Sequence, residues 1–82
     1  MNAKVDKIIK AIEDLYDIKL QKTEVVNGIA QHFKSVPKTE DDPEYTGYIG
    51  YRGNGELALL YMRRITMHSG GNLVEEVLEN RV

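Results

Sequence analysis

The stretch Tyr45–Met67, YTGYIGYRGNGELALLYMRRITM, decides the fold class of this 82-residue chain. Residues 45–52 are rich in aromatic and β-branched side chains, which predicts a strand. Gly53-Asn54-Gly55 then supplies residues that tolerate a positive φ, as a tight hairpin turn requires. The return segment 56–67 begins with strong helix formers. A helix there would leave the first strand without a neighbour in the chain, so we expect a β-hairpin.

Successive side chains of a strand point to opposite faces, so the hairpin should have one apolar face. With a three-residue loop, that face would carry Tyr45, Ile49, Tyr51, Leu57, Leu59 and Tyr61. Four tyrosines of this region are also interleaved with arginines, and both residue types are enriched at the energetic centres of protein interfaces. We therefore predict that the hairpin presents a partner-binding surface. Its residues are Tyr48, Tyr51, Arg52, Tyr61, Arg63 and Arg64.

Three helices are expected around the hairpin. Apolar residues recur at steps of three and four between Val5 and Tyr16, which predicts an amphipathic helix over about 3–16. Thr23 is a good N-cap, and an apolar stripe follows it up to Phe33, which predicts a second helix over about 24–34. Asn72 with Glu75 resembles a capping box, so a last helix is expected over 72–78. The expected fold is an α+β domain of order α-α-β-β-α, with residues 1–82 in a single domain.

Composition limits the function. Apolar residues make up 41% and charged residues 29% of the chain, as in ordinary globular domains rather than disordered ones. Cysteine is absent and the net charge is −2, so we expect neither disulfides nor a strongly basic nucleic-acid binder. No apolar run reaches the roughly 20 residues of a membrane span, and no signal-peptide pattern is visible. We expect a cytoplasmic protein without a membrane role.

The residues needed for catalysis are sparse. Ser35 and Ser69 are the only serines, and the two histidines, His32 and His68, belong to no catalytic motif. The acidic run at 40–44 lacks the alternating spacing and the turn glycine of a calcium loop, so we expect it to be a solvated loop. We therefore predict no enzymatic activity, no catalytic residues, no cofactor and no metal site.

Two kinds of binding remain. The first is a small regulator or inhibitor, of the kind that phages and mobile elements encode, which docks on a protein as a monomer or a homodimer. The alternative is nucleic-acid binding, with lysines on the phosphates and the hairpin tyrosines on the bases. Those lysines are Lys4, Lys7, Lys10, Lys19 and Lys22. Residues 49–53, IGYRG, also resemble the GXXG loop of KH domains, which implies close approach to a nucleic-acid backbone.

Overall fold

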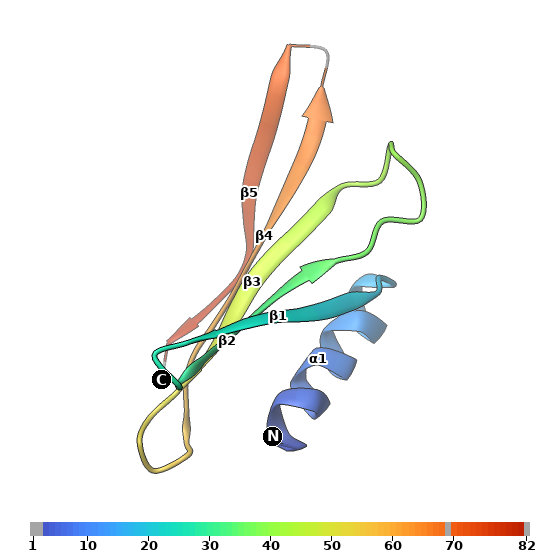
Figure 1. Cartoon of the computed structure of the whole chain (residues 1–82). Coiled ribbons are helices and arrows are strands. Elements are labelled where there is room, and N and C mark those ends of the chain that lie inside the picture. The colour runs from blue at the N-terminus through green and yellow to red at the C-terminus, as the bar shows by residue number, and fades with distance from the viewer. Residues whose placement is uncertain (1–2, 69, 82) are drawn as a thin grey trace.

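The computed structural model describes residues 3–68 and 70–81, which form one helix followed by five strands (Figure 1). The helix α1 spans Ala3–Tyr16, and the strands are β1 (Leu20–Val26), β2 (Ala30–Ser35), β3 (Glu44–Tyr51), β4 (Leu57–His68) and β5 (Gly71–Arg81). The strands form an antiparallel sheet in the order β1-β2-β3-β4-β5, in which each strand pairs with the next one along the chain. The fold is mostly β, and the expected order α-α-β-β-α is wrong.

Helix α1 is confirmed, and it packs on one face of the sheet. Its side chains Val5, Ile9 and Ile12 are buried, as the three- and four-residue spacing predicts. The helix ends where Asp17 takes a left-handed conformation with φ 53°. The amide of Ile18 then donates to the carbonyl of Glu13 at 3.1 Å, which satisfies one of the last carbonyls of the helix.

The expected helix over 24–34 is wrong, because this segment contains the turn between β1 and β2. Asn27 and Gly28 both have positive φ, 55° and 72°, and the amide of Ile29 donates to the carbonyl of Val26 at 3.2 Å. This pair of residues is the strongest local signal for a two-residue hairpin turn. The β-branched residues around it favour strands, and the turn directs them into antiparallel pairing, with Val26 opposite Ala30.

This turn supports a testable prediction. Gly28→Ala should lower the free energy of unfolding by about 1–2 kcal/mol, because an alanine in the left-handed region meets its own backbone. An added Cβ at Gly28 would touch nothing within 4 Å, so the cost comes from conformation alone. Urea denaturation measures it. Gly53→Ala, at a turn position where a Cβ is equally free, is the control and should change the stability far less.

The hairpin between β3 and β4 is confirmed, but its expected faces are partly wrong. Pairing places Ile49 opposite Leu60 and Tyr48 opposite Tyr61, so Tyr61 does not share a face with Ile49. The difference arises from a bulge between Gly50 and Tyr51, which shifts the register by one residue. Tyr45, Ile49 and Tyr51 therefore face the helix, whereas Leu59 and Tyr61 point to the other side of the sheet.

The expected helix over 72–78 is also wrong, because these residues belong to β5. This strand pairs with β4 at ten positions, from Leu59–Arg81 to His68–Gly71. Glu75 does not cap a helix; its carboxylate accepts a hydrogen bond from Arg64 at 3.0 Å. The long strand β4 needs a neighbour on each side to satisfy its backbone groups, and this long-range pairing outweighs the local helical pattern.

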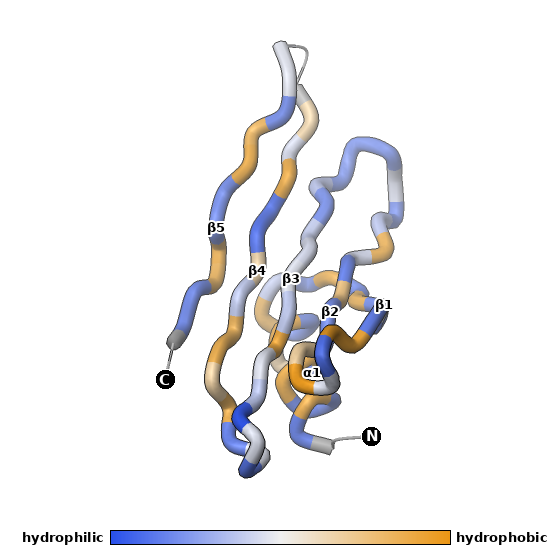
Figure 2. Tube along the Cα trace, turned by 60° about the vertical axis from the view of Figure 1, so that its left-hand side comes forward, coloured by the Kyte–Doolittle hydropathy of each residue, from blue (hydrophilic) through white to orange (hydrophobic). Residues whose placement is uncertain are grey.

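The hydrophobic core lies between α1 and the sheet. Phe33, Ile49 and Met62, one from each of three neighbouring strands, are at most 2% exposed under the helix. In Figure 2 the orange segments of α1 lie beside those of the strands. No helix covers the opposite face within the described residues. We call this second side of the sheet the open face.

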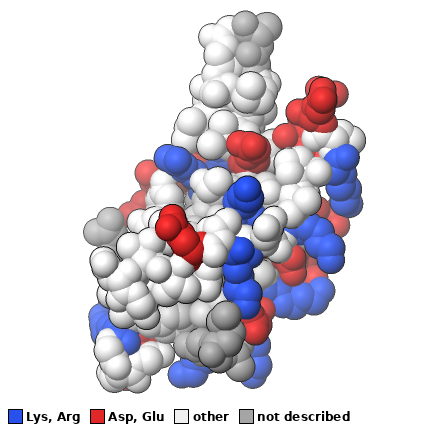
Figure 3. All heavy atoms as spheres, in the orientation of Figure 1, with Lys and Arg blue, Asp and Glu red and all other residues white. Residues whose placement is uncertain are grey.

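The ribbon formed by β4 and β5 extends past the rest of the sheet (Figure 1). The last pair between β3 and β4 joins Glu44 and Ile65, so residues 66–68 and 71–73 pair only with each other and form a two-stranded ribbon. Figure 3 shows no charged side chain on its visible outer end. The projection contributes to extents of 45 × 21 × 20 Å. In the part of the chain that the structure describes, no helix is both long and apolar enough to cross a membrane.

Candidate functional site

A row of three stacked rings crosses the middle of the open face. His32 on β2 pairs with Tyr48 on β3, which pairs with Tyr61 on β4. The ring centroids are 5.2 Å apart at each step, and the ring planes differ by 28° and 26°. We call His32, Tyr48 and Tyr61 the ring row.

The geometry of the ring row decides what it can contact. Neighbouring strands lie about 4.8 Å apart. Rings whose centroids are stacked 5.2 Å apart therefore stand upright on the sheet, with each ring plane roughly perpendicular to the line from one strand to the next. The two faces of the Tyr48 ring are therefore covered by His32 and Tyr61, and the edges of the rings point outward. A base of a nucleic acid stacks on an open ring face, which Tyr48 does not offer. Outward edges with phenol hydroxyls suit contacts to a protein surface, where tyrosine combines apolar area with a hydrogen-bonding group.

Polar side chains lie beside the ring row. Lys34, Thr46 and Arg63 occupy the next row of paired positions, and the Nε of Arg63 donates to the Oγ1 of Thr46 at 3.3 Å. A shallow hollow of about 440 Å³ runs over both rows. Its lining is Thr23, His32, Phe33, Lys34, Thr46, Gly47, Tyr48, Tyr61 and Arg63.

The same two rows end on acidic side chains. Glu79 pairs with Tyr61 and Glu76 pairs with Arg63, both from strand β5. Directly paired residues share a face of the sheet, so both carboxylates belong to the open face. Along these two rows the open face therefore carries Lys34 and His32 on β2, the two tyrosine rings with Thr46 and Arg63 in its centre, and two carboxylates on β5.

The structure brings together three of the six residues that the sequence predicts for partner binding, namely Tyr48, Tyr61 and Arg63. Tyr51 faces the helix side, where its hydroxyl is buried without a hydrogen-bond partner among the described residues and burial raises the pKa of the phenol. Arg52 lies at the distant β3–β4 turn, 3.8 Å from the carboxylate of Glu56. These two residues do not join the ring row.

Arg64 also lies away from the open face. Its Nη2 donates to the Oε1 of Glu75 at 3.0 Å, and Tyr45 provides a further hydrogen bond on the helix side. The hydrogen bond to Tyr45 and the one to Glu75 with its negative charge raise the pKa of the guanidinium. Arg64 therefore joins β4, β3 and β5 on the side of the sheet that carries α1.

The lysines of the nucleic-acid alternative lie on the helix side. Lys22 contacts Asp6 of α1 at 2.9 Å, and Lys10 contacts Asp14 at 3.0 Å. The carboxylate of Asp14 raises the pKa of Lys10 through a hydrogen bond and its charge. Lys4 and Lys7 belong to the same helix, and Lys19 precedes β1. The structure does not bring these lysines together with the tyrosines of the ring row.

The glycines expected to form a GXXG loop also lie elsewhere. Gly50 belongs to β3 and Gly53 to the turn, so residues 49–53 form the end of a strand and the start of a turn rather than a loop of their own. Gly47 instead allows β3 to lie close to β4 and to the ring of Phe33. A Cβ on Gly47 would collide with the backbone oxygen of Tyr61, and would lie 2.8 Å from the Cζ of Phe33 and 2.9 Å from the Cα of Met62.

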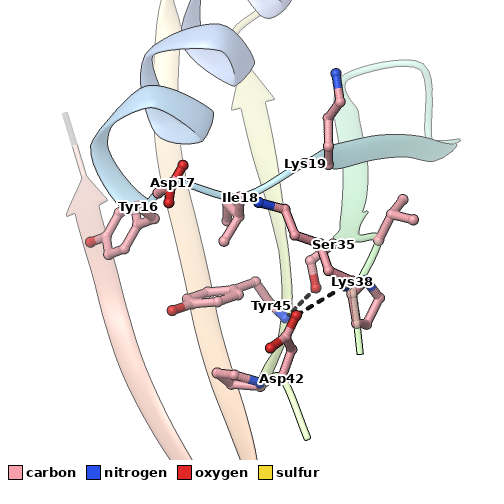
Figure 4. A pocket seen from close by; sticks show the side chains of 11 residues that line it. Tyr16, Asp17, Ile18, Lys19, Ser35, Lys38, Asp42 and Tyr45 are labelled. Atoms are coloured by element: carbon pink, nitrogen blue, oxygen red, sulfur yellow. Dashed lines mark hydrogen bonds between the residues drawn. The ribbon is translucent and has the colours of Figure 1, made fainter. Parts of the chain in front are cut away.

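The loop between β2 and β3 is organised by one of its acids. The Oδ2 of Asp42 accepts from the amides of Lys38 and Thr39 at 2.9 and 3.2 Å, and these hydrogen bonds lower the pKa of the carboxyl. The buried Ser35 accepts from the amide of Tyr45 at 2.8 Å, which ties the loop ends together. A hollow of about 290 Å³ separates this loop from the end of α1 (Figure 4).

Ser35 and His32, the candidate catalytic side chains that the structure describes, both contact the neighbouring strand β3. Ser35 is tied to the backbone of β3, and His32 is stacked on Tyr48. The described residues include no group of three or more histidine, cysteine or acidic side chains that could hold a metal ion. Ser69 and the side chain of His68 lie outside the described residues.

The side chains at the ends of the two rows do not figure among the sequence-predicted partner-binding residues: His32, Lys34, Glu76 and Glu79. His32, Lys34 and Glu76 lie in segments for which the sequence predicts helices, and Glu79 directly follows the second of these segments. The Asn27-Gly28 signal could have identified the first two, since a hairpin there makes His32 and Lys34 alternate with the buried Phe33. No comparable local signal exists for Glu76 and Glu79, because their positions depend on pairing with β4.

Comparison of the chain with models of protein families, with curated proteins and with solved structures finds no match.

Proposed function

We propose that this protein is a non-enzymatic binding protein that acts by docking on protein, and that the open face is its contact surface. The observation that carries the proposal is the ring row, three stacked rings on a sheet face that no helix of the described chain covers. Tyrosine, histidine and arginine together supply apolar area, hydroxyl groups and charge within one hollow. Such a mixture is typical of the centre of a protein interface.

Charge on the open face supports a protein partner. Lys34 and Arg63 share the open face with Glu44, Glu76 and Glu79, so the face carries charges of both signs. A nucleic acid would be repelled by the acidic edge, whereas a protein surface can offer complementary charges to both edges. The outward ring edges favour the same conclusion, because Tyr48 offers no free ring face for a base.

The proposal predicts a strong effect of Tyr48→Ala. Removing the central ring should weaken partner binding about 30-fold, which corresponds to the roughly 2 kcal/mol of an interface hot spot. Affinity capture from the host's lysate, with mass spectrometry and a titration of the captured partner, measures the effect. Leu15→Ala is the matched control, because Leu15 is 72% exposed on α1 and should leave binding unchanged.

Hydroxyl-radical footprinting tests the surface independently of the variants. Tyr48 and Tyr61 should be oxidised more slowly in a lysate or in a concentrated solution of the protein than in a dilute purified sample. Tyr51, on the other side of the sheet, should show no such difference. Equal oxidation of Tyr48 and Tyr61 under all of these conditions would contradict the proposal, since no protein would then cover the open face.

A further inference from the structure

We infer that the partner of the open face is a second copy of this chain, packed sheet against sheet about a two-fold axis that runs along the strands between β3 and β4. The inference rests on the proposed function, since it takes the open face to be a protein-binding surface. It adds which protein binds there and in which orientation.

The order of residue types across the sheet supports this orientation. One row reads Lys34, Thr46, Arg63, Glu76, and the next reads His32, Tyr48, Tyr61, Glu79. Each row starts with a basic or imidazole side chain on β2 and ends with a carboxylate on β5. A two-fold axis between β3 and β4 exchanges β2 with β5 and β3 with β4, because it relates strands at equal distances on either side.

The exchange produces complementary contacts at both ends of each row. Glu76 of one copy lies over Lys34 of the other, and Glu79 lies over His32. In the centre, Tyr48 of one copy meets Tyr61 of the other. An isologous interface repeats every contact twice, so all four ends of the rows are matched at once.

Other orientations of two open faces are less favourable. An axis across the strands would place β5 over β5, with Glu76 and Glu79 of both copies close together. Like charges brought together at an interface disfavour association. The axis along the strands is therefore the one that the charges select. Aligned sheets also pack about 10 Å apart, a spacing that rings standing on both sheets can fill from the two sides.

The chain exposes more surface than a compact monomer of its size. The chain exposes 5683 Å², whereas a compact monomer of 9.3 kDa is expected to expose about 5000 Å². The radius of gyration of 13.3 Å likewise exceeds the roughly 12 Å expected for a compact domain of 82 residues. A monomer of this size buries little core, and an interface on the open face would add to it.

Reversing the charge of Lys34 in one variant and of Glu76 in another tests the inference. The wild-type protein should sediment at twice its monomer mass at about 100 μM, well above the micromolar upper end of dissociation constants for standard interfaces. Lys34→Glu and Glu76→Lys should each weaken self-association about tenfold or more, because each places like charges together twice. An equimolar mixture of the two variants should recover the dimer, since both ends of the row then pair opposite charges.

Two controls accompany the exchange. Lys7→Glu changes the same charge on exposed α1 and should leave the dimer intact. Lys34 and Glu76 are exposed, so circular dichroism and thermal melting should show that both variants remain folded. Carbodiimide coupling in a mixture of ¹⁵N-labelled and unlabelled wild-type chains should join Lys34 of one isotope to Glu76 of the other, which a contact within one chain cannot produce.

The outcomes separate this inference from the proposed function. A wild-type chain that stays monomeric at about 100 μM contradicts the inference that the partner is a second copy of this chain. A dimer that neither variant weakens, or that the mixture fails to restore, also overturns it, since another surface must then form the contact. In either case the footprinting of Tyr48 and Tyr61 in lysate still decides whether a different protein covers the open face.

Discussion

Gly47→Ala is expected to destabilise the protein by about 3 kcal/mol or more, at the upper end of the cost of overpacking a core. The added methyl group would collide with the backbone oxygen of Tyr61 and would lie 2.8 Å from the ring of Phe33 and 2.9 Å from the Cα of Met62. Two of these three atoms belong to the backbone of β4, so no side-chain rotation can relieve the collision. Either β3 and β4 must separate or the variant must unfold.

Chemical denaturation followed by circular dichroism measures this loss. Gly53→Ala adds the same methyl group where nothing lies within 4 Å, and it should shift the midpoint little. Equal midpoints for the two variants would show that β3 and β4 are not as close as the structure places them. The whole stability of an 82-residue domain is about 4–12 kcal/mol, so the Gly47 variant should lose a large part of it.

Phe33→Ala is expected to cost about 3–5 kcal/mol, the range for removing a large aromatic side chain from a core. Phe33 is 2% exposed and belongs to the cluster that joins β2, β3 and β4 to α1. Its removal leaves a cavity beneath the helix that the rigid strands cannot close. The loss should appear in the thermal midpoint and in the denaturant midpoint alike.

Leu15→Ala provides the comparison for Phe33. It removes an apolar side chain of related size from α1, but this leucine is 72% exposed and should contribute little to stability. A Phe33 variant as stable as the Leu15 variant would contradict the core described above. Phe33→Ala should also relieve only part of the cost of Gly47→Ala, because the contacts with the backbone of Tyr61 and Met62 remain.

The candidate site was only partly predictable from the sequence. Tyr48, Tyr61 and Arg63 stand out because tyrosine and arginine alternate along a hairpin, and the structure gathers these three on one face. Tyr51 and Arg64 share the same pattern, yet the bulge after Gly50 and the pairing register direct them to the helix side. A shift of one residue reverses the face of a strand residue, and composition does not report such a shift.

The sequence by itself determined the elements whose information is local. The apolar spacing from Val5 to Tyr16 specifies α1, since one helix face buries Val5, Ile9 and Ile12 against the sheet. The segment 45–67 specifies the β3–β4 hairpin, through its β-favouring side chains and its glycine-rich turn. The Asn27-Gly28 turn is equally local, and its positive φ angles exclude the expected helix over 24–34.

Only the tertiary structure decided β5 and the open face. Residues 72–78 satisfy a helical pattern as well as a strand pattern, so local preference leaves the two states close in free energy. Pairing with the twelve-residue strand β4 satisfies backbone groups of both segments and settles the choice. The ring row and its charged ends follow from that pairing, because they join side chains of four strands that lie far apart in the chain.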